Sequence, residues 1–212
     1  MLFRSAPVVL VASAPYVLAV NPALPARSVQ ELIALAKSKP RELNFASTGN
    51  GSAPHLTGEL FNLAAGVTIV HVPYKGGPPA LTDLIGGQVQ MAFGNIVNYL
   101  PQARAGKLRA LAVTSAQRTK QAPELPTMIE AGLRDFASGT WFGVQVPAKT
   151  PAAIVERLNR AVNTVLAGRL PALLANEGAD PLGGSAREFA AFLDAELKRW
   201  ANVIRAANVR VD

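Results

Sequence analysis

Short apolar runs alternate with helical patterns between residues 43 and 113, and this alternation constrains the fold more than any other feature of the sequence. Strands are expected at 43–47, 68–72, 89–93 and 108–113, with a helix or partly helical link between them at 54–65, 78–85 and 95–106. Strands that alternate with helices form mostly parallel sheets covered by helices. The sequence therefore predicts an α/β fold for this stretch.

The N-terminal stretch MLFRSAPVVLVASAPYVLAV contains two apolar runs separated by Pro15. A basic residue, an apolar run and an Ala-Ser-Ala triplet are also features of signal peptides, but Pro7 and Pro15 would interrupt the helical centre of such a segment. Short valine-rich runs favour strands, so we interpret the stretch as two consecutive strands. A helix follows up to Pro40, and Ser28 and Glu31 have the spacing of a capping box at its start.

The segment after residue 113 begins with a proline-rich loop that carries a short expected helix at 128–131. A strand is expected at 138–147. Thr150 is expected to cap the following helix, with Pro151 in its first position, and a short helix follows at 170–176.

Ser185 and Glu188 form another capping box before the last helix. Two apolar stripes at helical spacing are expected to face the core. They comprise Ile154, Leu158, Val162 and Val165 on one helix, and Phe189, Phe192, Leu193, Leu197, Trp200, Val203 and Ile204 on the last.

The composition excludes several classes of function. The net charge is +7, but the basic residues are scattered rather than gathered in the stripe that nucleic-acid binding requires. A mild positive field assists encounter with small anions instead. There is no cysteine, so disulfide and thiolate chemistry are excluded, and no apolar run approaches the ~20 residues of a membrane span.

A run of small polar residues joins the expected strand 43–47 to the helix 54–65. These residues are Ser47, Thr48, Gly49, Asn50, Gly51 and Ser52. Ligands of open parallel sheets lie beyond the carboxyl ends of the strands, where the first turn of a helix has unpaired N–H groups and partial positive charge. We expect free N–H groups at residues 49–52 to hold a carboxylate or phosphate. A plain strand-to-helix turn is the alternative.

Two further positions lie at the same expected edge. The loop after 68–72 contains Tyr74, Lys75, Gly76 and Gly77, and Asn95 follows 89–93. These residues could supply backbone and side-chain donors, or form a Pro-Gly turn with a solvated lysine. His55 falls in the first turn of a helix, where it is expected to be neutral and either to donate to a ligand or to fix the loop. His71 is expected to be a packed strand residue.

Catalytic motifs are absent. GxxxxGK[ST] does not occur, Gly49-x-Gly51 matches only half of GxGxxG, and there is no GxSxG elbow. Asp83 and Asp135 have no evident carboxylate partner for acid–base catalysis, and two histidines without neighbouring carboxylates make a poor metal site. We predict a binding module without catalytic residues, metal or cofactor. An enzyme that uses the loop at 47–52 for a phosphate-bearing substrate is the alternative.

Long ordered segments of the chain resemble one family. The segments NPALPARSVQELIALAKSKPRELNFASTGNGSAPHLTGELF, HVPYKGGPPALTDLIGGQVQMAF and GKLRALAVTSAQRTKQAPELPTMIEAG resemble the substrate-binding proteins of tripartite tricarboxylate transporters, the Bug or TctC-like family. The resemblance implies a type II periplasmic-binding-protein-like fold whose two lobes close on a small organic anion, a periplasmic location and membrane transporter components as partners. It also implies that Ser47–Ser52 and Tyr74–Gly77 face the cleft, with His55 beside them.

The chain departs from the family in length. Family members usually begin with a signal peptide and a glycine-rich loop that supplies the other side of the cleft, and we do not expect the N-terminal stretch of this sequence to correspond to either. We therefore expect 13–134 to be the complete second lobe, and 1–12 and 135–212 to be a remnant of the first. Weak affinity and self-association through the incomplete lobe are expected, and a truncated fragment without transport function is the alternative. Gly94 stands where many members carry an aspartate.

Overall fold

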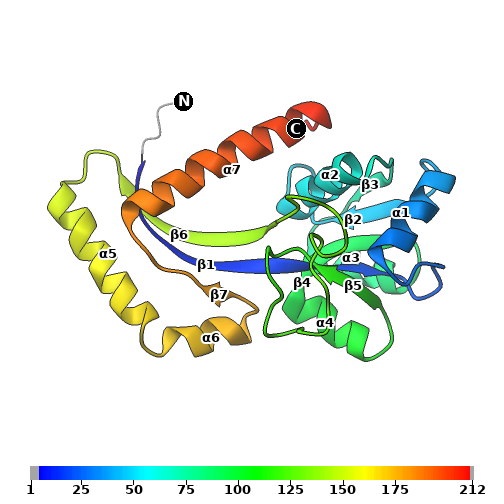
Figure 1. Ribbon diagram of the computed structural model, residues 1–212, viewed down its shortest axis with the longest axis horizontal. Helices are drawn as coiled ribbons and strands as arrows, with labels where there is room; N and C mark the ends of the chain where they lie inside the picture. The colour runs from blue at the N-terminus through cyan, green and yellow to red at the C-terminus, as the bar shows by residue number, and fades with distance from the viewer. Residues whose placement is uncertain (1–4, 211–212) are drawn as a thin grey trace. The chain divides into compact units, whose positions relative to one another are not determined.

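The computed structural model describes residues 5–210, and the chain divides into two compact units (Figure 1). Unit 1 contains Thr140–Ala201 and the chain up to Ala14, and unit 2 contains Pro15–Gly139 and the chain from Asn202. Strand β1 (Ser5–Val20) contributes residues to both units. The boundaries between the two units fall a few residues after the lobe boundaries expected from the sequence. The end of the last helix is grouped with unit 2.

Unit 2 is built on a sheet with the strand order β3-β2-β4-β1-β5. Strand β2 pairs in parallel with β3 and β4, whereas β1 is antiparallel to both β4 and β5. The predicted alternation and its parallel core are confirmed, but the antiparallel insertion of β1 was not foreseen. The strands that follow β1 in this sheet are β2 (Asn44–Ser47), β3 (Val70–Pro73), β4 (Met91–Asn95) and β5 (Arg109–Val113).

Four helices cover the two faces of this sheet (Figure 1). They are α1 (Val29–Ser38), α2 (Ala53–Ala65), α3 (Gly77–Ile85) and α4 (Ile96–Arg104). Phe45 and Phe93 pack with α1 and α2, and their neighbours Ala46 and Ala92 pack with α3 and α4. Successive strand residues point to opposite faces, so two separate hydrophobic cores form.

The capping box before α1 is confirmed with one difference. The Glu31 N–H donates to Ser28 Oγ at 3.1 Å, while the Glu31 carboxylate accepts from the N–H of Arg27 rather than that of Ser28. Both contacts satisfy N–H groups at the helix start.

The N-terminal stretch is extended as predicted, but two details of the expected elements are wrong. The two expected N-terminal strands form one strand, because the fixed φ of Pro15 is compatible with extended backbone. Pro15 lies between Ala12–Ser13, which pair with β7 (Asp180–Pro181), and Tyr16–Val20, which pair with β4 and β5. The expected helix at 128–131 is a hydrogen-bonded turn, closed by Thr127 and Glu130 through reciprocal side-chain contacts of 2.8 and 3.0 Å.

Unit 1 contains β6 (Gly139–Pro147) and β7, both paired with β1, and three helices. The Ser185–Glu188 capping box is confirmed, because the Glu188 N–H donates to Ser185 Oγ and the Ser185 N–H donates to the Glu188 carboxylate. The cap expected at Thr150 is wrong, since Pro151 occupies the cap position without a side-chain hydrogen bond. The helices are α5 (Ala152–Leu166), α6 (Leu170–Asn176) and α7 (Ala186–Ala206).

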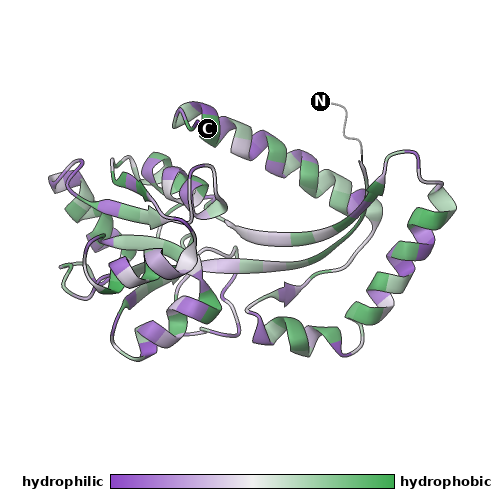
Figure 2. Ribbon diagram, turned by 180° about the vertical axis from the view of Figure 1, so that it is seen from behind, coloured by the Kyte–Doolittle hydropathy of each residue, from purple (hydrophilic) through white to green (hydrophobic). Residues whose placement is uncertain are grey.

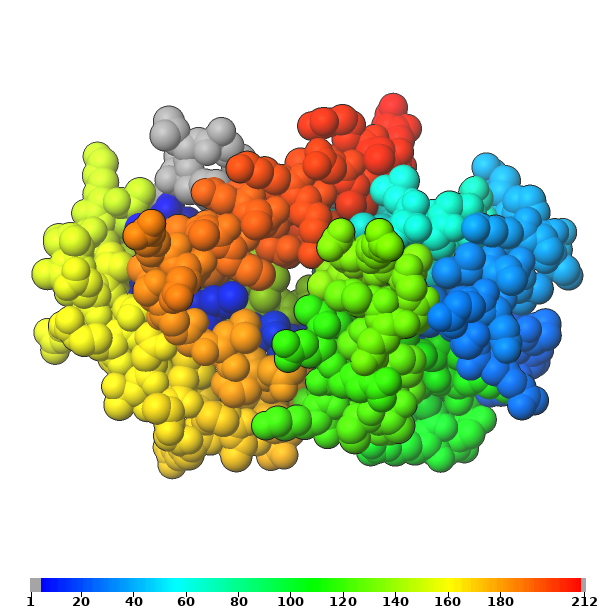
Figure 3. Space-filling model, viewed as in Figure 1, coloured from blue at the N-terminus to red at the C-terminus, as the bar shows by residue number. Residues whose placement is uncertain are grey.

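The apolar stripe of α5 is not buried as expected. Ile154 is 48% exposed and Val165 is 54% exposed, and apolar and polar bands alternate along α5 and α7 in Figure 2. Val162 of the same stripe is partly buried, and α5 and α6 lie next to each other at the surface in Figure 3. On α7, Phe189 and Val203 are buried, but Leu197 and Ile204 are exposed.

Candidate functional site

Three helices of unit 2 begin at one edge of its sheet. Strands β3, β2 and β4 are parallel neighbours in this order, and each leads at its carboxyl end into a helix. Residues 48–52 connect β2 to α2, residues 74–76 connect β3 to α3, and α4 follows β4 directly. Since a helix N-terminus carries about half a positive charge, this edge gathers three such partial charges.

The loop at 47–52 does not present its N–H groups as predicted. The Gly49 N–H donates to Ser47 Oγ at 3.1 Å, the Gly51 N–H to His55 Nδ1 at 3.0 Å, and the Ser52 N–H to the Gly49 carbonyl at 3.2 Å. The expectation of free N–H groups is therefore wrong at these three positions. Side chains that accept from nearby backbone groups compete with any ligand for them.

Other N–H groups of the same loop remain available. Those of Thr48, Asn50 and Ala53 have no hydrogen-bond partner within residues 5–210. Thr48 and Asn50 are exposed, whereas Gly49 and Gly51 are partly buried. Gly49 and Gly51 have φ values of 133° and 69°, which explains why glycine alternates with polar residues here. Over residues 48–51, N–H groups bonded within the protein thus alternate with unbonded N–H groups on exposed residues.

The second loop packs beside the first. The Tyr74 N–H donates to the Ser47 carbonyl at 3.0 Å. The Tyr74 hydroxyl donates to Asp83 Oδ2 at 2.8 Å, and burial together with this contact raises the pKa of Tyr74 to about 12. Its hydroxyl proton is therefore held by Asp83 and is not directed to a ligand.

The start of α3 offers few but accessible donors. Gly76 precedes α3 with a φ of 110°, and the N–H groups of Gly76 and Gly77 make no hydrogen bond in the described part of the chain. Pro78 and Pro79 have no N–H to contribute. Lys75 is exposed and forms no ion pair with any described residue.

Asn95 and Gly94 end the third strand. Asn95 is exposed and occupies the cap position of α4, where its side chain makes no capping hydrogen bond. Gly94 is buried, and a Cβ placed on it would lie 1.9 Å from the ring of Tyr99. Burial raises the pKa of Tyr99 to about 12. The aromatic ring thus fills the space that a side chain at position 94 would need.

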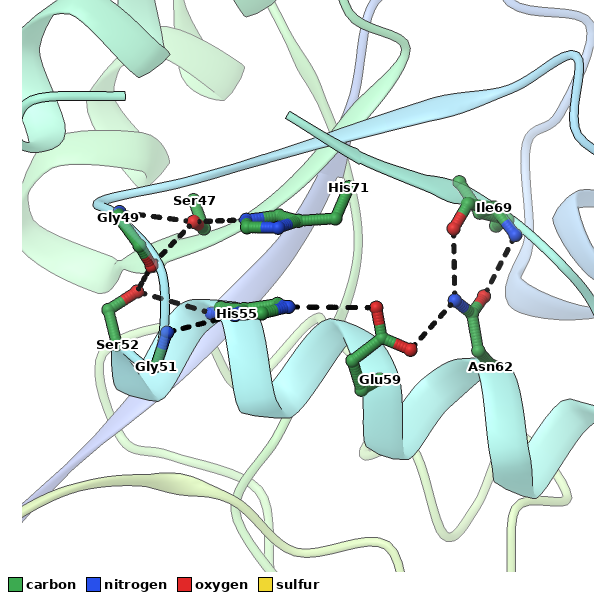
Figure 4. Close-up of polar contacts among 9 residues, drawn as sticks. All are labelled: Ser47, Gly49, Gly51, Ser52, His55, Glu59, Asn62, Ile69 and His71. Carbon is green, nitrogen blue, oxygen red and sulfur yellow. Dashed lines mark hydrogen bonds and ion pairs between the residues drawn. The ribbon is translucent and has the colours of Figure 1, made fainter. Parts of the chain in front are cut away.

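The two histidines form a stacked pair behind the first loop (Figure 4). Their ring centroids lie 3.6 Å apart with an interplanar angle of 7°, and the His71 ring also lies 5.0 Å from that of Phe45. His71 Nε2 lies 2.6 Å from Ser47 Oγ. The sequence reasoning treated His71 only as a packed residue. Its register opposite Phe45 on the neighbouring strand is the feature that places it beside the loop.

Both imidazoles are neutral at neutral pH. Burial lowers the pKa of His55, and burial and the neighbouring His55 lower the pKa of His71 to about 4. His55 Nε2 lies 3.7 Å from Glu59 Oε1, which is too long for a hydrogen bond. Burial also raises the pKa of Glu59. Within residues 5–210 no cluster of three or more metal-binding side chains is found, and no helix is both long and apolar enough to cross a membrane.

The fold is periplasmic-binding-protein-like, because the chain matches solved structures of this class with TM-scores of 0.82 and 0.85. Residues 4–209 match the family described as tripartite tricarboxylate transporter family receptor, and the chain belongs to this family. The resemblance noted from the sequence is thereby confirmed. The family is one of solute receptors and not of enzymes, so the phosphate-using enzyme is not supported.

Three related proteins illustrate the match. Protein BugT of Bordetella pertussis is 38% identical over 206 residues, which are 97% of this chain and 63% of BugT. The structure of R. palustris Rpa4515 with adipate is 39% identical, has a TM-score of 0.82, and is matched over 97% of this chain and 69% of its own. The periplasmic binding protein BugD is 31% identical, has a TM-score of 0.78, and is matched over 97% of this chain and 70% of its own. The chain thus spans less than two thirds of the length of BugT.

Proposed function

We propose that this chain is part of an extracytoplasmic solute receptor that binds a small organic anion, a carboxylate or dicarboxylate, at the carboxyl edge of β2, β3 and β4. The observation that carries the proposal is the convergence of three helix N-termini at this edge, with several N–H groups that have no partner among the described residues. Such an arrangement favours negative charge without requiring a buried cation. The adipate bound to the related Rpa4515 is an anion of this class.

Donors in the proposed site come from both loops. The N–H groups of Thr48 and Asn50 act from the first loop, and those of Gly76 and Gly77 from the second. Side chains of Lys75 and Asn95 extend the donor set at the rim. The remaining predicted residues support these donors, and they are Ser47, Gly49, Gly51, Ser52, His55 and Tyr74.

The cellular setting is part of the same proposal. We place the protein in the periplasm, as BugD is, and infer that the membrane components of a tripartite transporter are its partners. We also assign 13–134 to a complete ligand-binding lobe, and 1–12 and 135–212 to the other lobe. Solute receptors gain affinity when two lobes enclose the ligand, so binding by the 212-residue chain is expected to be weak.

Isothermal titration tests the proposal with adipate and its uncharged analogue 1,6-hexanediol. We expect adipate to bind in the micromolar to millimolar range and hexanediol not to bind. Citrate, glutamate and terephthalate extend the test to other carboxylates. Equal heats for adipate and hexanediol would contradict an anion site. Sub-micromolar binding would instead contradict the expectation that one lobe binds weakly.

A further inference from the structure

Each imidazole of the stacked pair contacts a different end of the loop at 47–52 (Figure 4). His71 Nε2 contacts the Ser47 hydroxyl at the start of the loop, 2.6 Å away. His55 Nδ1 accepts from the Gly51 N–H near its end, 3.0 Å away. Because the rings are stacked at 3.6 Å, the two ends of the loop are tied to a single rigid unit.

The contacts continue through the loop and close on themselves. Ser47 Oγ accepts from the Gly49 N–H, and the Gly49 carbonyl accepts from Ser52 Oγ at 2.7 Å. Ser52 Oγ in turn accepts from the His55 N–H at 3.4 Å. The series His71, Ser47, Gly49, Ser52 and His55 therefore returns to its starting point through the ring stack. A closed network fixes every member, because no residue can turn without breaking two contacts.

We propose that His71 and His55 are positioning residues, which act as a neutral stacked pair to turn the N–H groups of Gly49 and Gly51 inward and those of Thr48 and Asn50 outward. That these outward groups bind an anion rests on the proposed function, whereas the positioning itself does not. Neither histidine needs to touch the ligand. The pair sets which donors of the loop are offered to solvent.

The geometry requires the pair to be neutral. His55 Nδ1 accepts the Gly51 N–H, so a proton on Nδ1 would point at a donor and break the contact. Two cationic rings at 3.6 Å would also repel each other. Glu59 and Phe45 are the neighbours of the pair from the elements packed around it. Glu59 on α2 lies 3.7 Å from His55 Nε2 and is contacted by Asn62, and Phe45 on β2 covers His71.

Three variants of the 212-residue chain test the positioning. His71→Phe keeps an aromatic ring for stacking but removes the contact with Ser47, and Ser47→Ala removes the same contact from the other side. Val72→Ala is the matched control, because Val72 neighbours His71 on β3 but packs in the opposite core. Amide hydrogen exchange and ¹⁵N chemical shifts are measured without ligand, and adipate affinity is measured separately.

We expect exchange to be roughly tenfold faster for the Gly49 and Gly51 N–H groups in His71→Phe and for the Gly51 N–H in Ser47→Ala, and to be unchanged in Val72→Ala. The His55 Nδ1 resonance should be that of an unprotonated nitrogen at neutral pH. Unchanged Gly49 and Gly51 exchange in His71→Phe, or a protonated Nδ1, would overturn the positioning role. If His71→Phe does not fold, the Gly51 N–H of Ser47→Ala decides the matter, because Ser47 is the acceptor of the Gly49 N–H but not of the Gly51 N–H. If exchange changes as expected but the unmodified chain binds no carboxylate, the positioning role stands and the proposed function fails.

Discussion

The ring of Tyr99 occupies the place of a side chain at Gly94, because a Cβ there would lie between 1.9 and 2.2 Å from three of its carbon atoms. Tyr99 is itself buried among side chains of α3, α4 and the sheet, so the ring has little room to move. The glycine at this strand end is therefore a packing requirement of the chain, and the aspartate that many relatives were expected to carry cannot be introduced without rearrangement.

Gly94→Ala should lower the free energy of unfolding by about 1–3 kcal/mol, the usual cost of overpacking a core. Gly94→Asp should cost more, since it also buries a carboxylate. Urea unfolding of each variant measures these effects. Gly77→Ala is the control, because a Cβ at Gly77 meets nothing within 4 Å. A Gly94→Ala variant as stable as the unmodified chain would show that Tyr99 moves freely.

Acidification should destabilise the fold through the stacked histidines. The pKa of His71 is about 4 in the folded state and 6.5 in the unfolded state, and that of His55 is also lowered. The unfolded chain therefore binds more protons in this window, and stability falls as pH decreases from about 6.5 toward 4. Urea unfolding at several pH values measures the slope.

Glu59 changes the pH dependence of stability in the opposite direction. Its folded pKa is raised above 4.5, so its contribution to stability is lost as pH rises through that region. Glu59 is present in both the unmodified chain and His71→Phe, so the comparison of their slopes between pH 7.5 and about 5.5 reports on the histidine. His71→Phe should flatten the slope in this range. An equal slope in the variant would show that His71 does not bind the protons concerned.

Lys75→Met should weaken adipate binding by roughly threefold to fivefold, as expected for one exposed charge. The loss should be smaller at high salt, because salt screens exposed charges. Lys107→Met provides the control, since Lys107 is also exposed but precedes β5, at the opposite end of the strands. Equal losses in both variants would indicate a general effect of net charge and not a local contact.

The exposed stripe on α5 should cause self-association. Ile154, Leu158 and Val165 form a large apolar surface on one helix, and such surfaces promote association in water. Light scattering of the unmodified chain should show species larger than a monomer. Leu158→Lys with Val165→Lys should shift the population toward monomer with little change in stability, while Arg157→Lys should have no effect. A monomer throughout the accessible concentration range would contradict this expectation.

Local patterns predicted most elements of the fold, because periodicity and caps act within a few residues. The Ser185–Glu188 box and the β2–β4 alternation are examples. The insertion of β1 between β4 and β5 depends on pairing with residues far along the chain, which no local pattern reports. The burial of the α5 stripe was predicted from its spacing alone, and spacing does not reveal whether a covering layer is present.

The candidate site was predicted less completely than the fold. The small-residue loop was located correctly at the edge of the sheet, but of the N–H groups expected to be free at residues 49–52, those of Gly49, Gly51 and Ser52 are bonded within the protein and that of Asn50 is not. Ser47 and His55 accept from N–H groups two and four residues away, and such local competition is a known property of polar side chains. The role of His71 required knowledge of the β2–β3 register, which joins residues 24 positions apart.

The alternation of bonded and unbonded N–H groups in the loop has a consequence for how a solute would bind and leave. The outward groups of Thr48 and Asn50 make no bond within the described chain, so water can satisfy them whenever no solute is present. If this edge binds an anion as proposed, the anion would displace solvent and leave the internal bonding of the loop intact. Capture and release at this edge can therefore proceed without any step in which the bend itself must come apart and reform.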